Sequence, residues 1–192
     1  ATFALGVAAY PEKSWEAILL PIALAVVGIL CSIFGSFLIR TKEGASQREL
    51  LGTLRRGTYT AAVLAAIIAA PLTYFILGSW GVYVAILCGL IGGCAIGYFT
   101  EYYTSDTYKP TQNLANATET GAATTIIGGL SLGMLSTIAP ILIVGAAVVI
   151  SFLAAGGTMT TNSADYTFLF SKGLYGIGIS AVGMLSTLGI TL

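Results

Sequence analysis

Residues 101–112 read Glu-Tyr-Tyr-Thr-Ser-Asp-Thr-Tyr-Lys-Pro-Thr-Gln, a polar patch in a chain that is otherwise strongly apolar. Within the stretch Gly89–Gly133, one apolar, glycine-containing segment precedes this patch and another follows it. The patch and the residues just after it hold four of the sixteen charged residues, namely Glu101, Asp106, Lys109 and Glu119. The apolar segments therefore decide the fold, and the patch is where function is sought.

The composition is that of a protein surrounded by lipid. Of the 192 residues, 56% are hydrophobic and only 8% are charged, and the mean hydropathy is +0.91. Soluble domains carry roughly 25% charged residues. Because helices satisfy their own backbone hydrogen bonds in lipid, we predict an all-α fold, a polytopic transmembrane helix bundle with about five spans. The formal net charge is zero, and we expect the lipid bilayer, not nucleic acid, as a partner.

Apolar segments long enough to cross a hydrocarbon core of about 30 Å divide the chain. The predicted spans are Ala17–Ile39, Gly57–Leu77, Val82–Thr100, Ala122–Ala155 and Leu174–Leu192, and Ala1–Ala9 is predicted to end an earlier span. The fourth is longer than one span, so we expect a short helical entry segment to about Gly133 before it crosses. Pro21 falls in the first turns of its span, where a missing N–H group is tolerated.

The whole chain, residues 1–192, is predicted to be a single transmembrane region and an internal piece of a longer membrane protein. The segments Arg40–Arg56 and Glu101–Gly121 carry six of the eight lysines and arginines, against two in Tyr10–Glu16 and Gly156–Gly173. Basic loops favour the cytoplasm, which places the first two segments on the cytoplasmic side. A head-group or nucleic-acid site in the basic linker is the alternative, and we interpret the linker as a cytoplasmic loop.

Three glycines recur every four residues in the third predicted span, at Gly89, Gly93 and Gly97. This spacing puts them on one helix face, where another helix can approach closely. We predict a helix-packing role for them. A second pattern, Gly-Met-Leu-Ser-Thr, occurs at 133–137 and again at 183–187. An internal repeat and chance both explain it.

Glu101 is the one carboxylate that adjoins the end of a predicted span. A carboxylate at or inside a membrane is costly and is often used in ion relays, but a solvated interfacial glutamate explains it equally well. The chain has no histidine, its three cysteines lie in apolar runs, and its acidic residues after residue 60 are dispersed. We therefore predict no catalytic residue and no metal ligand within this chain.

Several motifs resemble those of the membrane-integral, ion-pumping pyrophosphatases. The most specific are the runs 97–105, Gly-Tyr-Phe-Thr-Glu-Tyr-Tyr-Thr-Ser, and 108–112, Tyr-Lys-Pro-Thr-Gln. The later runs 121–124, 129–134, 174–176 and 183–187 are similar to segments that follow in that family, in order and spacing. The residues before about 80 match mainly in the order of the spans.

The resemblance implies a parent protein of about sixteen transmembrane helices that works as a homodimer in a prokaryotic cell membrane. Such enzymes hydrolyse inorganic pyrophosphate with Mg²⁺ on the cytoplasmic side and pump H⁺ or Na⁺ outward, and some need K⁺. This chain would run from the end of the sixth span into the eleventh. The resemblance also makes Glu101 a candidate for ion coupling.

The family's aspartate-rich motifs, which bind the metal–pyrophosphate complex, would lie before Ala1 and after Leu192. We therefore expect this piece to be scaffold, with Mg²⁺ and pyrophosphate bound by the rest of the parent chain, and to be inactive alone. The alternatives are a fragment of a secondary transporter or a structural membrane subunit. Both explain the hydropathy, but neither explains the motif at 101–112.

Overall fold

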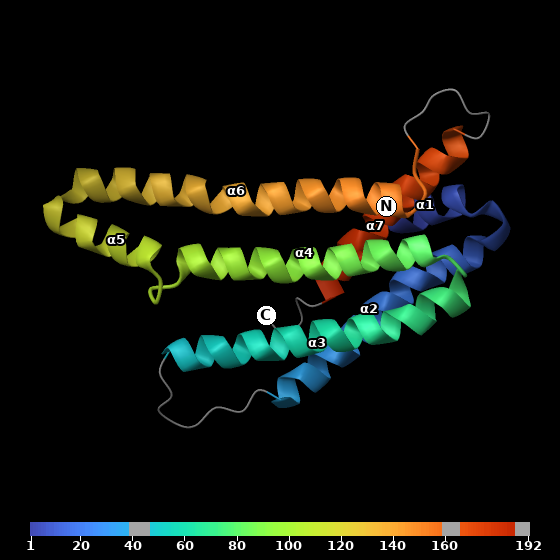
Figure 1. Cartoon of the computed structure of the whole chain (residues 1–192), viewed down its shortest axis with the longest axis horizontal. Coiled ribbons are helices and arrows are strands. Elements are labelled where there is room, and N and C mark those ends of the chain that lie inside the picture. Colours follow the sequence, from blue (N-terminus) through green and yellow to red (C-terminus); the bar gives the residue numbers. More distant parts are fainter. Residues whose placement is uncertain (39–46, 159–165, 187–192) are drawn as a thin grey trace. The chain divides into compact units, whose positions relative to one another are not determined.

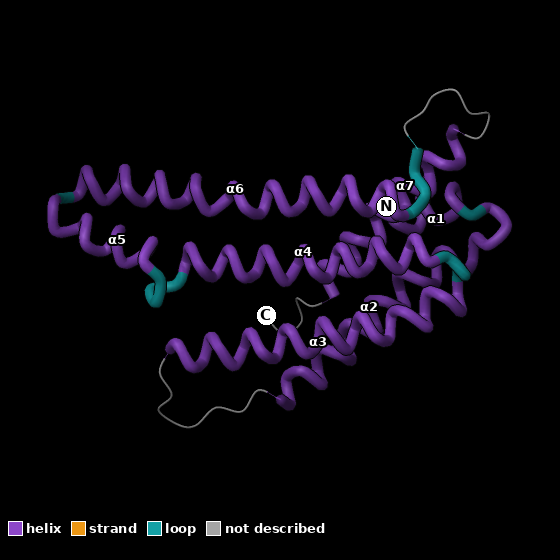
Figure 2. Tube along the Cα trace, viewed as in Figure 1, coloured by secondary structure: helices purple, strands orange, loops and turns teal. Residues whose placement is uncertain are grey.

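The computed structural model describes residues 1–38, 47–158 and 166–186, and within them every regular element is a helix (Figure 1, Figure 2). The elements are α1 (Thr2–Ala9), η1 (Pro11–Lys13), α2 (Ser14–Leu38), α3 (Gln47–Ile76), α4 (Trp80–Thr104), α5 (Lys109–Ala117), η2 (Thr118–Thr120), α6 (Ala122–Ala154) and α7 (Tyr166–Ser186). Among the described residues, five helical segments are long and apolar enough to cross a membrane: Pro11–Phe37, Glu49–Ile76, Trp80–Thr120, Ala122–Ala154 and Thr167–Ser186. The prediction of an all-α, polytopic membrane protein with about five spans is confirmed.

The chain divides into two compact units. One unit contains Ala1–Cys94 and Ala147–Leu192, and the other contains Ala95–Ala146. In the first unit α1 packs against α2 and α7, and α2 packs against α3. The largest fully buried side chains there include Leu20, Ile86 and Tyr175. The second unit contains the polar patch, on the end of α4, the turn after it and the start of α5.

Two helices, α3 and α7, begin two turns or more before the residue that their hydropathy predicts. Helix α3 starts at Gln47 instead of Gly57, so Arg55 and Arg56 lie on a helix and not in a loop. Helix α7 starts at Tyr166 instead of Leu174, so Lys172 is also helical. Hydropathy identifies only the apolar part of a helix, which can lie in lipid. The helical backbone hydrogen bonds can extend beyond that part into polar residues until a helix-ending residue interrupts them. The predicted end of the first full span at Ile39, the predicted loop residues 40–46 and 159–165, and the predicted end of the last span at 187–192 lie outside the described residues.

Helix α6 is continuous, so the predicted entry segment to about Gly133 and the span predicted after it are parts of one helix. It runs for 33 residues with Pro140 in its interior, a length of about 50 Å at 1.5 Å per residue. A glycine inside a helix costs only about 1 kcal/mol relative to alanine. In an apolar sequence the backbone has no partner better than its own helix, so the helix continues through Gly133.

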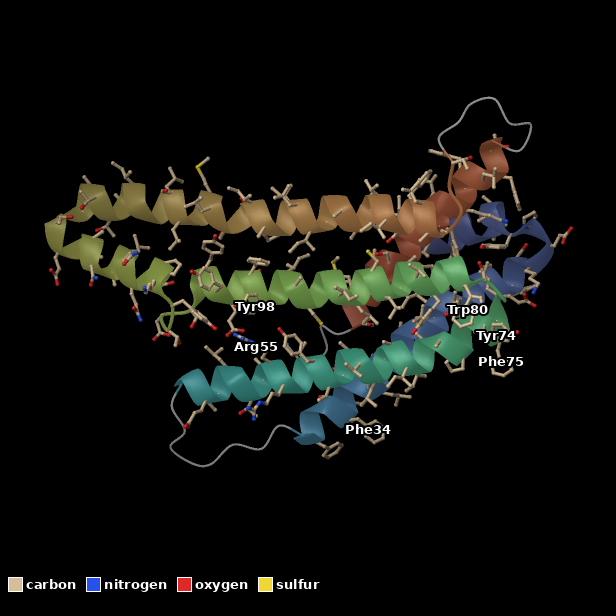
Figure 3. All side chains as sticks on the ribbon, viewed as in Figure 1. Phe34, Arg55, Tyr74, Phe75, Trp80 and Tyr98 are labelled. Atoms are coloured by element: carbon tan, nitrogen blue, oxygen red, sulfur yellow. The ribbon has the colours of Figure 1, made fainter. Side chains whose placement is uncertain are left out.

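The turn between α3 and α4 is built on a glycine and surrounded by aromatic rings. Gly78 has a φ of +67°, and its N–H donates to the carbonyl oxygens of Thr73 and Tyr74, which ends α3 with a left-handed residue. The side chains of Tyr74, Phe75 and Trp80 gather beside this turn (Figure 3), with the ring centroids of Tyr74 and Trp80 6.1 Å apart. Exposed aromatic rings at the ends of apolar helices are typical of membrane–water interfaces.

Pro21 is the eighth residue of α2, so the prediction that its missing N–H falls in a tolerated position is wrong. In a regular helix that N–H would bond the carbonyl oxygen of Ala17, which is fully buried here. The hydroxyl of Tyr175, on α7, donates to this oxygen at 2.8 Å. A side chain 158 positions away therefore supplies the hydrogen bond that the proline removes.

Replacing Tyr175 with phenylalanine should lower the stability of the full-length protein by about 1–3 kcal/mol, because the Ala17 carbonyl would then be buried without a donor. The measurement is the thermal unfolding midpoint of the purified protein in detergent. Tyr59→Phe is the matched control, because the Tyr59 ring is 40% exposed. Equal unfolding midpoints for the two variants would contradict the role assigned to the Tyr175 hydroxyl.

Candidate functional site

The polar patch forms a helical corner between α4 and α5. Helix α4 continues to Thr104, so Glu101 lies in the last turn of this helix. The sequence had predicted that Glu101 lies in a loop. The Ser105 hydroxyl hydrogen-bonds the hydroxyl of Thr107 at 3.0 Å and accepts the Thr107 N–H at 3.3 Å. This local pairing turns the chain, and Pro110 then occupies a first-turn position of α5, where a proline is well suited to start a helix.

Hydrogen bonds and ring contacts fix α5 against the end of α4. The Thr111 hydroxyl donates to the backbone oxygen of Tyr103 at 3.2 Å. The ring of Tyr102 meets the rings of Tyr103 and Tyr108, with centroids 5.2 and 5.1 Å apart. The Tyr102–Tyr103 pair is edge-to-face, a geometry that contributes about 0.5–1.5 kcal/mol beyond the buried area, and the Tyr102–Tyr108 pair is tilted. The corner is therefore a packed structure and not a loose loop.

The other side of α5 leads into α6 through a short hydroxyl-rich link. Gly121 has a φ of +128°, a conformation that favours glycine, and it separates η2 from α6. The Thr124 hydroxyl hydrogen-bonds the hydroxyl of Thr120 at 2.7 Å and donates to the carbonyl oxygens of Gly121 and Ala117. These bonds satisfy backbone groups where η2 meets α6.

A groove of about 500 Å³ lies within the second unit, between the end of α4, α5 and α6. Its lining comprises Tyr102, Tyr103, Lys109, Pro110, Asn113, Leu114, Ala117, Gly128, Ser131, Leu132 and Leu135. The only charged side chain in this lining is Lys109, which is exposed. Glu101 is half-buried and is not part of the lining.

The three glycines predicted to pack helices have different surroundings. A Cβ atom added to Gly89 would collide with the carbonyl oxygen of Ser180 on α7, and one added to Gly93 would lie 3.2 Å from the Cγ of Met184. No described atom that could contact a Cβ on Gly97 lies within 4 Å of it. The packing role of all three stays a prediction.

A lysine at the start of α7 lies among aromatic rings in the first unit. The Nζ of Lys172 is 4.3 Å from the centroid of Phe168 and 5.4 Å from that of Tyr10. Burial raises the pKa of the Tyr10 phenol, and a hydrogen bond with Ser79 partly opposes this effect. Tyr10 is therefore neutral at physiological pH, and its ring acts as a cation–π partner for the lysine.

A sequence model of the family described as inorganic H⁺ pyrophosphatase matches residues 1–192. The chain belongs to this family. The described residues contain no group of three or more histidine, cysteine, aspartate or glutamate side chains that could hold a metal ion.

Curated relatives are pyrophosphate-energized pumps from bacteria and archaea. A protein of Bacteroides thetaiotaomicron, provisionally named a K⁺-stimulated pyrophosphate-energized sodium pump, is 47% identical over the whole of this chain and 26% of its own length. A K⁺-stimulated sodium pump of Thermotoga maritima is 35% identical over 92% of this chain and 24% of its own length. A K⁺-insensitive proton pump of Caldanaerobacter subterraneus is 34% identical over 95% of this chain and 26% of its own length. The chain thus spans about a quarter of the length of these pyrophosphatase relatives.

Sequence reasoning missed the groove and the bond between Tyr175 and Ala17. The groove had a local signal, since Pro110, Leu114 and Ala117 follow the i, i+4, i+7 spacing of one helix face. The hydrogen bond to Ala17 had none, because nothing near Tyr175 in the sequence points to a carbonyl on α2. In this pyrophosphatase-family chain, local patterns therefore indicate helix faces but not long-range partners.

Proposed function

We propose that this chain is part of a membrane-integral inorganic pyrophosphatase that couples pyrophosphate hydrolysis to outward pumping of H⁺ or Na⁺. The observation that supports this most is the family match over residues 1–192. The five apolar helical segments fit a multi-pass location, and the positive-inside bias would put the corner around Glu101 in the cytoplasm. A prokaryotic cell membrane is proposed because the relatives come from bacteria and archaea.

Within such a pump we propose that this piece packs around a reaction centre formed by the rest of the parent chain. In support, the described residues hold no group of three or more histidine, cysteine, aspartate or glutamate side chains that could bind a metal ion. Mg²⁺ and pyrophosphate would then be bound by residues outside this chain. The parent is proposed to work as a homodimer, on the strength of the motif resemblance at 97–112.

A finer proposal is that the parent is a K⁺-stimulated sodium pump. The support is the higher identity to the provisionally named sodium pump of Bacteroides, 47%, than to the K⁺-insensitive proton pump of Caldanaerobacter, 34%. We expect K⁺ to raise the rate of hydrolysis by the parent protein.

The experiment uses the full-length protein that contains this chain, in vesicles with the cytoplasmic face outward. Pyrophosphate with Mg²⁺ should drive ²²Na⁺ uptake, and K⁺ should increase it. Proton uptake without K⁺ stimulation would replace the finer proposal and leave the pyrophosphatase function in place. Uptake driven by a solute gradient without pyrophosphate would favour the secondary transporter, and neither activity would favour a structural subunit. Residues 1–192 expressed alone should insert in membranes and hydrolyse no pyrophosphate.

A further inference from the structure

The lining of the groove between α4, α5 and α6 contains both polar and apolar residues. The polar residues include Lys109, Tyr102, Tyr103 and Asn113. The apolar residues include Leu114 on α5 and Leu132 and Leu135 on α6. A ligand that fills this groove therefore has a polar end and an apolar end.

Helix lengths place the groove at the level of the lipid head groups. In α4, the apolar run from Trp80 to Thr100 contains 21 residues, about 31 Å, which is one hydrocarbon thickness. Tyr102 and Tyr103 follow directly, where interfacial tyrosines are expected. In α6, a length of about 30 Å counted back from Ala154 reaches Leu135. Both helices thus bring groove residues to the edge of the bilayer.

The charge of the lining suits a phosphodiester. Lys109 is its one charged side chain, and the carboxylates of Glu101, Asp106 and Glu119 are not part of the lining. An ammonium with nearby phenol and amide donors complements the acceptor oxygens of a phosphate group. Lysines close to a membrane surface also attract anionic phospholipids.

The apolar residues of the lining adjoin an exposed apolar face of α6. Leu135, which lines the groove, is 48% exposed, and Ile138 and Leu142, which lie further toward Ala154, are 51% and 67% exposed. An acyl chain that leaves the groove along Leu135 would therefore stay in contact with apolar side chains as it enters the bilayer. A free phosphate or pyrophosphate ion has no group that could use this surface.

We propose that this groove is a phospholipid-binding site, with the lipid phosphodiester at Lys109 and Asn113 and one acyl chain along Leu132 and Leu135. The site lies outside the proposed hydrolytic function and makes the α4–α5 corner a contact point between the pump and its membrane. Its occupant is an anionic phospholipid, chosen because the lining carries a single positive charge and no negative one.

The test uses the full-length protein in vesicles that contain phosphatidylglycerol with a diazirine on its acyl chain. After photolysis, mass spectrometry should find the label on Leu132 or Leu135. Lys109→Gln should lower this labelling about fivefold, the effect of losing one lysine contact with an anionic head group. Ser131→Trp should abolish it by filling the groove without a change of charge. Lys172→Gln is the matched control and should leave it unchanged.

Three outcomes would overturn the proposal. Labelling that inorganic pyrophosphate or phosphate competes away would mean that the groove binds a free anion. Labelling that neither Lys109→Gln nor Ser131→Trp alters would mean random contact with bulk lipid. Absence of label at Leu132 and Leu135, with label elsewhere on the protein, would mean that another segment of the protein fills the groove.

Discussion

Gly89→Leu is expected to prevent assembly of the full-length protein. Even the first atom of any side chain at position 89 would collide with the carbonyl oxygen of Ser180, and it would lie 2.9 and 3.1 Å from the carbonyl carbon and Cα of that residue. All three are backbone atoms of α7, so no rotamer change relieves the clash. Helices α4 and α7 would have to separate, which should cost more than about 4 kcal/mol.

Two further variants on α4 make this result specific. Gly93→Leu should cause a smaller loss, because the nearest atom is the Cγ of the flexible Met184 side chain at 3.2 Å, although its carbonyl oxygen is also close, at 3.3 Å. Gly97→Leu is the control, since no described contact lies within 4 Å. The measurement is the yield of monodisperse protein by size-exclusion chromatography. Wild-type yield and unfolding midpoint for Gly89→Leu would remove the packing role of this glycine.

Glu101→Gln is expected to impair ion pumping much more than pyrophosphate hydrolysis, so that several-fold fewer ions move per pyrophosphate. The half-buried carboxylate lies in the last turn of α4, just past an uncharged run of 21 residues. A carboxylate at or inside a membrane is often part of an ion relay. Glutamine keeps the shape of the side chain but removes its charge and its ability to exchange a proton or bind a cation.

Glu119→Gln is the matched control, because Glu119 is an exposed carboxylate of η2 in the same unit and should affect neither rate. Ion uptake and phosphate release are measured on the same vesicles, so that their ratio is independent of protein yield. Glu101→Asp should restore part of the ratio. An equal loss of hydrolysis and uptake in Glu101→Gln would show that the carboxylate supports folding or hydrolysis and not coupling.

The sequence was sufficient to predict the helical class and the approximate spans, because uncharged runs of about 20 residues have few alternatives in lipid. It was insufficient for helix ends. The residues before Gly57 and Leu174 are too polar to count as spans, yet they continue the helices α3 and α7. The polarity of a segment indicates whether lipid or water surrounds it. The end of a helix depends instead on where the backbone hydrogen-bonding pattern is interrupted, as at Gly78.

For the candidate site, the sequence indicated the polar patch and Glu101 but not their arrangement. Pro110 suggested an interruption between helices, and the structure shows that it begins α5. The groove depends on Leu114 lying near Gly128, and a Cβ on that glycine would be 3.1 Å from a methyl carbon of Leu114. Such a contact between residues of two helices depends on the turn between them, which no local pattern of apolar residues specifies.

The hydrogen bond between Tyr175 and the Ala17 carbonyl has a consequence for biosynthesis. A ribosome releases α2 long before it makes Tyr175, so the newly inserted helix carries an unsatisfied carbonyl group beside Pro21. That group needs water or a temporary partner until α7 enters the membrane. Helix α7 therefore supplies the last hydrogen bond that α2 needs, and the final folding of α2 must follow translation of α7.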